Sequence, residues 1–390
     1  MPHEIRFADR LPYTDKGKLQ HTGPEAQVLA TAPQDTMTPS ADQREDAQDE
    51  APASLAGEPA ASEIFSPVGE LPLTVIDLDQ ATIAALRETC ALAPRSGVRI
   101  GVDRGGAVPG GVADLFDILL TTGEATGKKW VRVAPEDLDR EIGRLSARAA
   151  ATPFAASVFA QVLRMGASLS FDEGLILESF AYSTLLAGGE FHAWRAANPA
   201  RRRSAEPEHL VDVERERALL RISLNRPAAH NGLNARMRDQ LAEALRAAVA
   251  DPMISRILLK GEGPSFCSGG DLDEFGSATD QALAHAVRIA RSVSSLVHRC
   301  TDRVSVRLHG ACLGAGIEIA AAAGSITADR SARLGLPEVG MGLIPGAGGT
   351  VTVRRRIGRH RTCYLGLSSH RLTAEEALAW GLIDGLEDCA

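Results

Sequence analysis

The chain has 390 residues, of which 44% are hydrophobic, and a formal net charge of −8 at pH 7. Its length exceeds that of one ordinary domain, and its apolar content is enough for a sizeable core. The negative balance excludes a general electrostatic attraction to nucleic acid or to an anionic membrane, so we expect small molecules or further copies of the chain as partners.

The cysteines stand singly, without a Cys-x-x-Cys pair or the density of a disulfide framework: Cys90, Cys267, Cys300, Cys312, Cys363 and Cys389. We therefore expect reduced thiols and a cytoplasmic location. The N-terminus lacks the apolar core of a signal peptide, and no stretch approaches the ~20 apolar residues of a membrane-spanning helix. No spacing of histidine and cysteine suggests zinc, so we expect no metal.

Residues 1–70 are predicted to be a disordered N-terminal segment. From residue 21 onward this segment is rich in Ala, Pro, acidic and small polar residues, and Phe65 is its only aromatic residue there. Such a composition has too little apolar surface to offset the loss of chain entropy on folding.

Residues 71–132 are predicted to form a small α/β unit. The runs LPLTVIDLD, GVRIGVD and KKWVRV are typical of strands, and DQATIAALRETCALA and VADLFDILLTT have helical spacing. The alternation of the two patterns predicts strands and helices in turn.

Residues 133–203 are predicted to be helical. The stretches PEDLDREIGRLSARAAA, TPFAASVFAQVLRMG and SFDEGLILESFAYSTLLAGGEFHAWRAA each open with Ser, Thr or Pro. The following ANPARRRSAEPEH is predicted to be a linker. Contact of Arg201, Arg202 and Arg203 with a phosphate is the alternative to a solvated linker.

Residues 211–390 return to alternation. Strands are predicted in ALLRISLNRP, SRILLKG, VSVRLHG and SITAD, and helices in NARMRDQLAEALRAAVADP, in a long stretch from about Asp280 to Cys300, and in GIEIAAAA. Such repeats indicate parallel strands with functional loops at their carboxyl ends.

Five motifs in this half occur in a family-specific order: LNRPAAHNGLN, GEGPSFCSGGDLDEF, HGACLGAGIEIA, LPEVGMGLIPGAGGT and LTAEEALAWGLID. Their series resembles the crotonase, or enoyl-CoA hydratase/isomerase, superfamily. The resemblance implies an α/β fold with a crotonase-like ββα spiral core and appended helices. It also implies an acyl-CoA thioester substrate, with coenzyme A as part of the substrate rather than a cofactor, and a homo-trimer or hexamer.

The resemblance assigns an oxyanion hole to the main-chain N–H groups of Gly270 and Ala315. Such donors hold the negative charge that builds on a thioester oxygen in an enolate. The backbone from Ser268 through Gly269 and Gly270 to Asp271 is matched to the path of bound coenzyme A, with Asp271 fixing the loop. Ser268, Gly269, Gly270, Asp271 and Ala315 are thus the predicted substrate-binding residues, and a purely structural turn is the alternative.

The same resemblance assigns catalysis to Glu318 and Glu338. In hydratases of the family the matching pair activates water for attack at the β-carbon while a proton reaches the α-carbon. Two neighbouring carboxyl groups push their pKa values apart, so one can act as an acid and the other as a base. An exposed loop glutamate is the alternative for Glu338, and Leu336 stands where many hydratases have a polar residue.

Several other functions stay open. Enoyl-CoA isomerisation by a single glutamate is the main enzymatic alternative, and a non-catalytic acyl-CoA-binding protein is the alternative from another class. A thiol mechanism through Cys267 or Cys312 is disfavoured because neither has a visible base. An unrelated N-terminal module, as in dioxygenase-type crotonases with long N-terminal extensions, is a further alternative. Oxygen chemistry is disfavoured because those relatives do not keep the arrangement of two glutamates. The basic stretch RRRIGRHR, residues 354–361, is expected on a solvated or intersubunit face rather than on coenzyme A phosphates.

A departure from the family concerns the order of segments. Family members usually continue beyond the last motif through helices that cover the acyl pocket, whereas this chain carries a similar pattern earlier, in residues 133–202. We therefore expect a circular permutation, in which this segment packs on the crotonase core.

Overall fold

The structure is a computed structural model, and it describes residues 66–69, 72–79, 82–92, 96–105, 111–124, 127–201 and 206–387. Most of the predicted disordered segment, together with Arg202, Arg203 and Cys389, lies outside these residues. In the described ranges, no helix combines the length and the apolar character needed to cross a bilayer.

The first described unit is a parallel four-stranded sheet in the order β1-β2-β3-β4. Its elements are β1 (Leu73–Asp77), α2 (Ile83–Leu92), β2 (Val98–Asp103), the 3-10 helix η1 (Ala113–Leu115), β3 (Ile118–Thr121) and β4 (Val131–Arg132). The helix predicted for VADLFDILLTT is wrong, since its second half is β3. All four residues of β3 are buried between two neighbouring strands, and a short apolar run is compatible with either structure.

Four α-helices follow where three helical stretches are predicted. After the 3-10 helix η2 (Pro135–Asp137) come α3 (Leu138–Ala151), α4 (Pro153–Gly166), α5 (Phe171–Leu186) and α6 (Gly189–Ala197). The third stretch divides at Gly188, which has an extended backbone and precedes α6. Ser170 begins α5 with a capping box, in which its hydroxyl accepts from Glu173 N–H and the Glu173 carboxylate accepts from Ser170 N–H.

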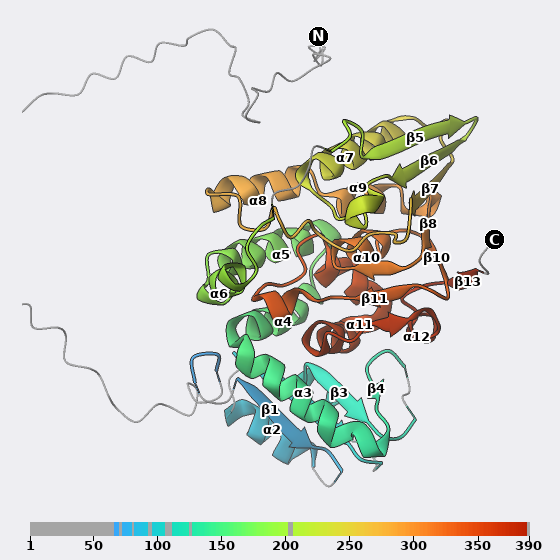
Figure 1. The fold of residues 1–390 in the computed structure, drawn as a ribbon. Coiled ribbons are helices and arrows are strands. Elements are labelled where there is room, and N and C mark those ends of the chain that lie inside the picture. Colours follow the sequence, from blue (N-terminus) through green and yellow to red (C-terminus); the bar gives the residue numbers. More distant parts are fainter. Residues whose placement is uncertain are drawn as a thin grey trace, which may run out of the picture. The chain divides into compact units, whose positions relative to one another are not determined.

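The core is built on a six-stranded sheet in the order β13-β10-β8-β7-β6-β5 (Figure 1). Its strands are β5 (Val211–Glu216), β6 (Leu219–Leu224), β7 (Arg256–Gly261), β8 (Val304–Leu308), β10 (Ser325–Asp329) and β13 (Gly385–Glu387). All pairs are parallel except β5 with β6, and β5 has no counterpart among the predicted strands. In β8 buried and exposed residues alternate, so one face of the sheet is covered.

A second row of short strands lies in a three-stranded sheet, β12-β11-β9. It consists of β9 (Ala311–Leu313), β11 (Arg333–Gly335) and β12 (Leu372–Thr373), and isolated bridges join Leu233 to Gly270 and Cys267 to Cys312. A long strand, a short strand and a helix thus repeat: β8 leads through β9 to α10 (Ala315–Ala320), and β10 leads through β11 to α11 (Gly349–Ser368). This repeat confirms the expected ββα core.

The remaining core elements are α7 (Ala235–Ala250), α8 (Gln281–Ala290), α9 (Val293–Arg299), α12 (Ala374–Trp380) and the 3-10 helices η3 (Pro227–Ala229), η4 (Thr301–Arg303) and η5 (Glu338–Met341). The single long helix expected from Asp280 to Cys300 is broken between α8 and α9. The hydroxyl of Ser292 accepts from Ser295 N–H, and this cap begins the second helix.

Helices α4 and α5 pack against the core. Phe159 of α4 is fully buried and rests on Gly366 of α11, where an added Cβ would lie 2.3 Å from the phenyl ring. Gly174 of α5 meets Val351 in the same way, at 2.8 Å. Figure 1 shows α5 beside α8. The packing that the permutation hypothesis requires is therefore present.

The expectation that the basic stretch 354–361 is solvated is wrong for its second half, which packs inside the molecule, whereas Arg355 is exposed. Arg359 donates to Phe116 O at 2.7 Å, and Arg361 donates to Trp130 O at 3.0 Å. His360 is buried and lies 2.8 Å from Ala113 O. The basic side chains satisfy carbonyl groups of the small α/β unit and so join it to α11.

Candidate active site

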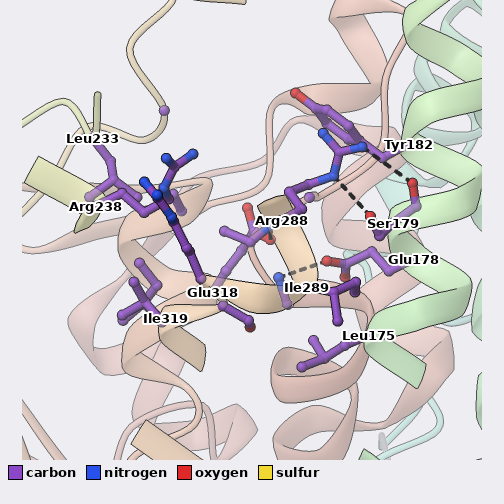
Figure 2. Close-up of a pocket in the computed structure, with 18 of the residues that line it drawn as sticks. Leu175, Glu178, Ser179, Tyr182, Leu233, Arg238, Arg288, Ile289, Glu318 and Ile319 are labelled. Carbon is purple, nitrogen blue, oxygen red and sulfur yellow. Dashed lines mark hydrogen bonds between the residues drawn. The ribbon is translucent and has the colours of Figure 1, made fainter. Parts of the chain in front are cut away.

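A cavity of about 210 Å³ lies between the core and α5. Both predicted glutamates and both predicted oxyanion-hole residues line it: Glu318, Glu338, Gly270 and Ala315. Helix α5 adds Leu175, Glu178, Ser179 and Tyr182, and the break between α8 and α9 adds Arg288, Ile289, Arg291, Ser292 and Val293 (Figure 2). Residues that are far apart in the sequence thus meet in one space.

The loops that carry Gly270 and Ala315 run side by side. Cys267 N–H donates to Ala311 O at 3.1 Å, and Leu313 N–H donates to Cys267 O at 3.0 Å. In the described part of the chain, the N–H groups of Gly270 and Ala315 have no protein acceptor. Two residues whose amides have no protein acceptor therefore line the same cavity. An oxyanion hole requires that both amides point at one ligand oxygen.

Glu318 lies in the apolar helix α10 and is 2% exposed. Its Oε2 accepts hydrogen bonds from the N–H groups of Ala347 at 2.7 Å and Gly349 at 2.8 Å. Burial raises the pKa of Glu318 to about 7, while the two amides act in the opposite direction because they favour the ionised form. This carboxyl group can therefore exchange protons near neutral pH.

Glu338 opens the 3-10 helix η5 and is also buried. Its Oε2 has no hydrogen-bond partner among the described residues. Burial, and then the charge of Glu318, raise the pKa of Glu338 well above its ordinary value. Both effects favour the protonated form of Glu338. Leu336 is part of the buried core, where it contributes no polar group.

Gly314 allows the close approach of Glu338 to the second loop. Its backbone has φ 47° and ψ −124°, a conformation that side chains rarely permit. An added Cβ would lie 2.3 Å from Glu338 Oε1. Because Gly314 has no side chain, the carboxyl group of Glu338 can lie close to this loop, next to Ala315.

A third buried carboxyl group, Glu178 of α5, enters the cavity. Its Oε1 accepts from Gly348 N–H at 2.7 Å, and its Oε2 accepts from Thr350 N–H at 2.9 Å and from the Thr350 hydroxyl at 2.7 Å. Burial and the charge of Glu318 raise the pKa of Glu178 to about 8. Four successive amides, from residue 347 to residue 350, thus alternate between Glu318 and Glu178.

The other predicted substrate-binding residues lie in the loop beside the cavity and do not line it. Asp271 is buried and forms an ion pair of 2.7 Å with Arg226, which holds the loop in place. Ser268 N–H donates to His230 O at 2.9 Å, and Gly269 has φ 110°. Their contact with a ligand stays a prediction.

The cysteines beside the loops are unsuited to nucleophilic chemistry. Burial raises the pKa of Cys267 to about 11 and that of Cys312 well above its ordinary value. Within the described residues, no group of three or more His, Cys, Asp or Glu side chains is arranged to hold a metal ion.

Comparison with known proteins identifies relatives of the core. The profile of the enoyl-CoA hydratase/isomerase family matches residues 214–387. The 2,3-dehydroadipyl-CoA hydratase of Escherichia coli (strain K12) is 34% identical over 172 residues, which are 44% of this chain and 66% of that protein. YngF of Bacillus subtilis (strain 168), provisionally named an enoyl-CoA hydratase/isomerase, is 35% identical over 45% of this chain and 67% of its own length.

Another relative is named as an isomerase. The 1,2-epoxyphenylacetyl-CoA isomerase of Escherichia coli (strain K12) is 35% identical over 43% of this chain and 66% of its own length. Among solved structures, an enoyl-CoA hydratase from Thermoplasma volcanium GSS1 is 32% identical, with a TM-score of 0.43 over 46% of this chain and 72% of that chain. The chain spans about two thirds of the curated relatives it matches.

The chain therefore belongs to the enoyl-CoA hydratase/isomerase family, the crotonase superfamily. The match covers residues 214–387. The named relatives in this enzyme family include hydratases and isomerases.

Proposed function

We propose that the protein catalyses the reversible addition of water to a trans-2-enoyl-CoA. The observation that carries the proposal is the meeting of two buried carboxyl groups, Glu318 and Glu338, with the acceptor-free amides of Gly270 and Ala315 in one cavity. The amides would hold the thioester oxygen as it becomes an enolate. The carboxyl groups would move the protons.

The two glutamates have different roles in this proposal. Glu318, which accepts two amide hydrogen bonds, is the easier of the two to ionise and serves as the base toward water. Glu338 has an oxygen with no donor near it, keeps its proton and serves as the acid toward the α-carbon. Different surroundings thus divide acid and base work between two identical side chains.

Hydration moves two protons and forms one carbon–oxygen bond. Glu318 takes one proton from water as the water oxygen bonds to the β-carbon, and the electrons of the double bond pass to the thioester oxygen as an enolate. The enolate collapses as its α-carbon takes the proton of Glu338. Glu318 is then protonated and Glu338 ionised. Glu318 releases one proton to solvent and Glu338 takes one up, which restores the starting state.

The same cavity would also suit an enoyl-CoA isomerase, and two of the relatives are named as isomerases. Isomerisation needs a single carboxyl group to move a proton between carbons and has no use for an ordered water. We favour hydration because both Glu318 and Glu338 line the cavity.

Loss of the ultraviolet absorbance of the conjugated thioester in crotonyl-CoA measures hydration directly. We expect Glu318→Gln and Glu338→Gln each to lower turnover by about 100-fold or more, the usual size of general acid–base contributions. Because Glu318 has a pKa of about 7 and acts ionised, kcat/KM should rise with pH through that value. Wild-type rates in both variants would exclude the mechanism, and tight thioester binding without turnover would indicate a binding protein.

We also infer that α3 to α6 cover the acyl pocket as the helices after the core do in relatives. Support comes from α5, which supplies four residues to the cavity wall and holds the turn before α11 through Glu178. The family match begins at residue 214, after these helices, and leaves about one third of each relative unmatched. Helices that precede the matched core and still wall its cavity are what a circular permutation predicts.

A further inference from the structure

Arg288 is a cation on the cavity wall without a carboxylate partner. Its Nε donates to the Ser179 hydroxyl at 3.0 Å, its Nη2 donates to the Ser183 hydroxyl, and its guanidinium lies 4.8 Å from the centre of the Tyr182 ring. No carboxylate in the described part of the chain lies within ion-pair distance of it. Neutral partners thus hold the guanidinium in position and leave it without a carboxylate in direct contact.

The neighbouring arginines differ in this respect. Arg238 and Arg291 also line the cavity, and both form ion pairs with Asp239. Burial lowers the pKa of Arg288, Tyr182 and Glu178 act in the opposite direction, and the charge of Arg238 lowers it again. Partial burial without a counter-ion is unfavourable for a guanidinium, and an anionic ligand would relieve it.

The carboxyl groups of the cavity form no ion pair with Arg288, although the charge of Glu178 acts on it from a distance. Glu178 and Glu318 accept hydrogen bonds from the amides of residues 347–350, and Glu338 lies against Gly314. The Tyr182 phenol is within electrostatic reach of Arg288 and of all three glutamates, so cation and carboxyl groups share one space.

The position of Arg288 in the cavity indicates that it would contact the acyl chain of a bound thioester. In Figure 2, Arg288, Ser179 and Tyr182 lie on the opposite side of Glu318 from Leu233 and Arg238. Leu233 is bridged to Gly270, in the loop matched to the path of coenzyme A. A thioester that enters along this loop would direct its acyl chain past the glutamates toward α5 and α8.

We propose that the cavity takes an acyl-CoA whose acyl chain ends in a carboxylate, and that Arg288 is the residue that selects it. The inference rests on the proposed function only in that the cavity binds an acyl-CoA. Nη1 of Arg288 makes no hydrogen bond to a described residue and is available to the carboxylate. A guanidinium held by two serines and one aromatic ring needs little reorganisation to bind it.

Calorimetric binding of two saturated six-carbon thioesters tests this without turnover. Adipoyl-CoA carries a terminal carboxylate and hexanoyl-CoA a methyl group, and free coenzyme A reports on the phosphates alone. We expect the wild-type protein to bind adipoyl-CoA about 10- to 100-fold more tightly than hexanoyl-CoA, the range for a charge-assisted hydrogen bond. Arg288→Met should abolish the preference and leave hexanoyl-CoA binding within about threefold, which also shows an intact cavity.

Arg221→Met is the matched control, because Arg221 lies on β6 in an exposed ion pair with Glu216 and should leave the preference unchanged. Equal wild-type affinity for the two thioesters would overturn the inference and leave the proposed function standing. The inference would also be overturned if Arg288→Met weakened the binding of free coenzyme A as much as that of adipoyl-CoA, since Arg288 would then bind a phosphate of coenzyme A. Failure of the wild-type protein to bind either thioester would overturn both proposals.

Discussion

Glu178 gives the sharpest prediction about stability, because it is buried and has a strongly raised pKa. Its value of about 8 compares with an ordinary value of 4.5. The folded protein therefore holds a proton that the unfolded chain releases. The contribution of this group to stability is full below about pH 4.5 and is lost as the pH rises through about 8. At ~1.4 kcal/mol per pKa unit, on the order of 2 to 3 kcal/mol is lost between about pH 5 and pH 7.

Glu178→Gln removes this titration and also one hydrogen-bond acceptor. A glutamine has one acceptor oxygen, so at least one of the donors on Gly348 and Thr350 loses its partner. We expect the variant to be less stable than the wild type by about 1 to 3 kcal/mol at about pH 5. Between about pH 5 and pH 7, the free energy of unfolding of the variant should fall by about 2 to 3 kcal/mol less than that of the wild type.

Urea unfolding, followed by tryptophan fluorescence across this pH range, measures both effects. Glu214→Gln is the control, because Glu214 is exposed on β5 and should leave the slope unchanged. If Glu178→Gln keeps the full wild-type slope, the three donors hold the Glu178 carboxylate ionised, and the argument from burial fails.

Two further predictions concern the loops. Gly314→Ala should lower turnover of crotonyl-CoA at least about tenfold and destabilise the fold by about 1 to 3 kcal/mol, because its Cβ would collide with Glu338 and its φ is positive; unchanged kinetics would mean that the position of Glu338 is unimportant. Cys267→Ser should keep at least about half of the wild-type rate, because the buried thiol stays protonated; an inactive variant that still folds would reinstate a thiol mechanism.

Much of the core was predictable from local pattern. The strands β6, β7, β8 and β10 and the helices α7 and α10 lie in runs with clear periodicity. The errors lie where the pattern is ambiguous or where tertiary contacts decide. β3 is a short apolar run, and the division of the helix expected from Asp280 depends on a cap at Ser292 that resembles an ordinary interior serine.

The cavity was only partly predictable. Motif order located the glycine loops and two glutamates that line it, but Glu178 and Arg288 belong to segments without a recognised motif. Glu178 did leave one trace, since an acidic residue within the apolar stretch LILESFAY is costly to bury without partners. Arg288 left none, because arginine on an amphipathic helix usually faces water.

The amides of residues 347–350 donate alternately to Glu318 and Glu178, and this arrangement affects the order in which the protein folds. Glu178 precedes Glu318 by 140 positions, so the ribosome synthesises it well before Glu318. Glu178 can bind the turn at residues 347–350 only after α5 has docked on the core, so the second half of the polypeptide, which carries both proposed catalytic glutamates, has an incomplete cavity wall until then. A chain divided between residues 201 and 206 should stay inert until its two fragments are recombined, and activity would then report their association.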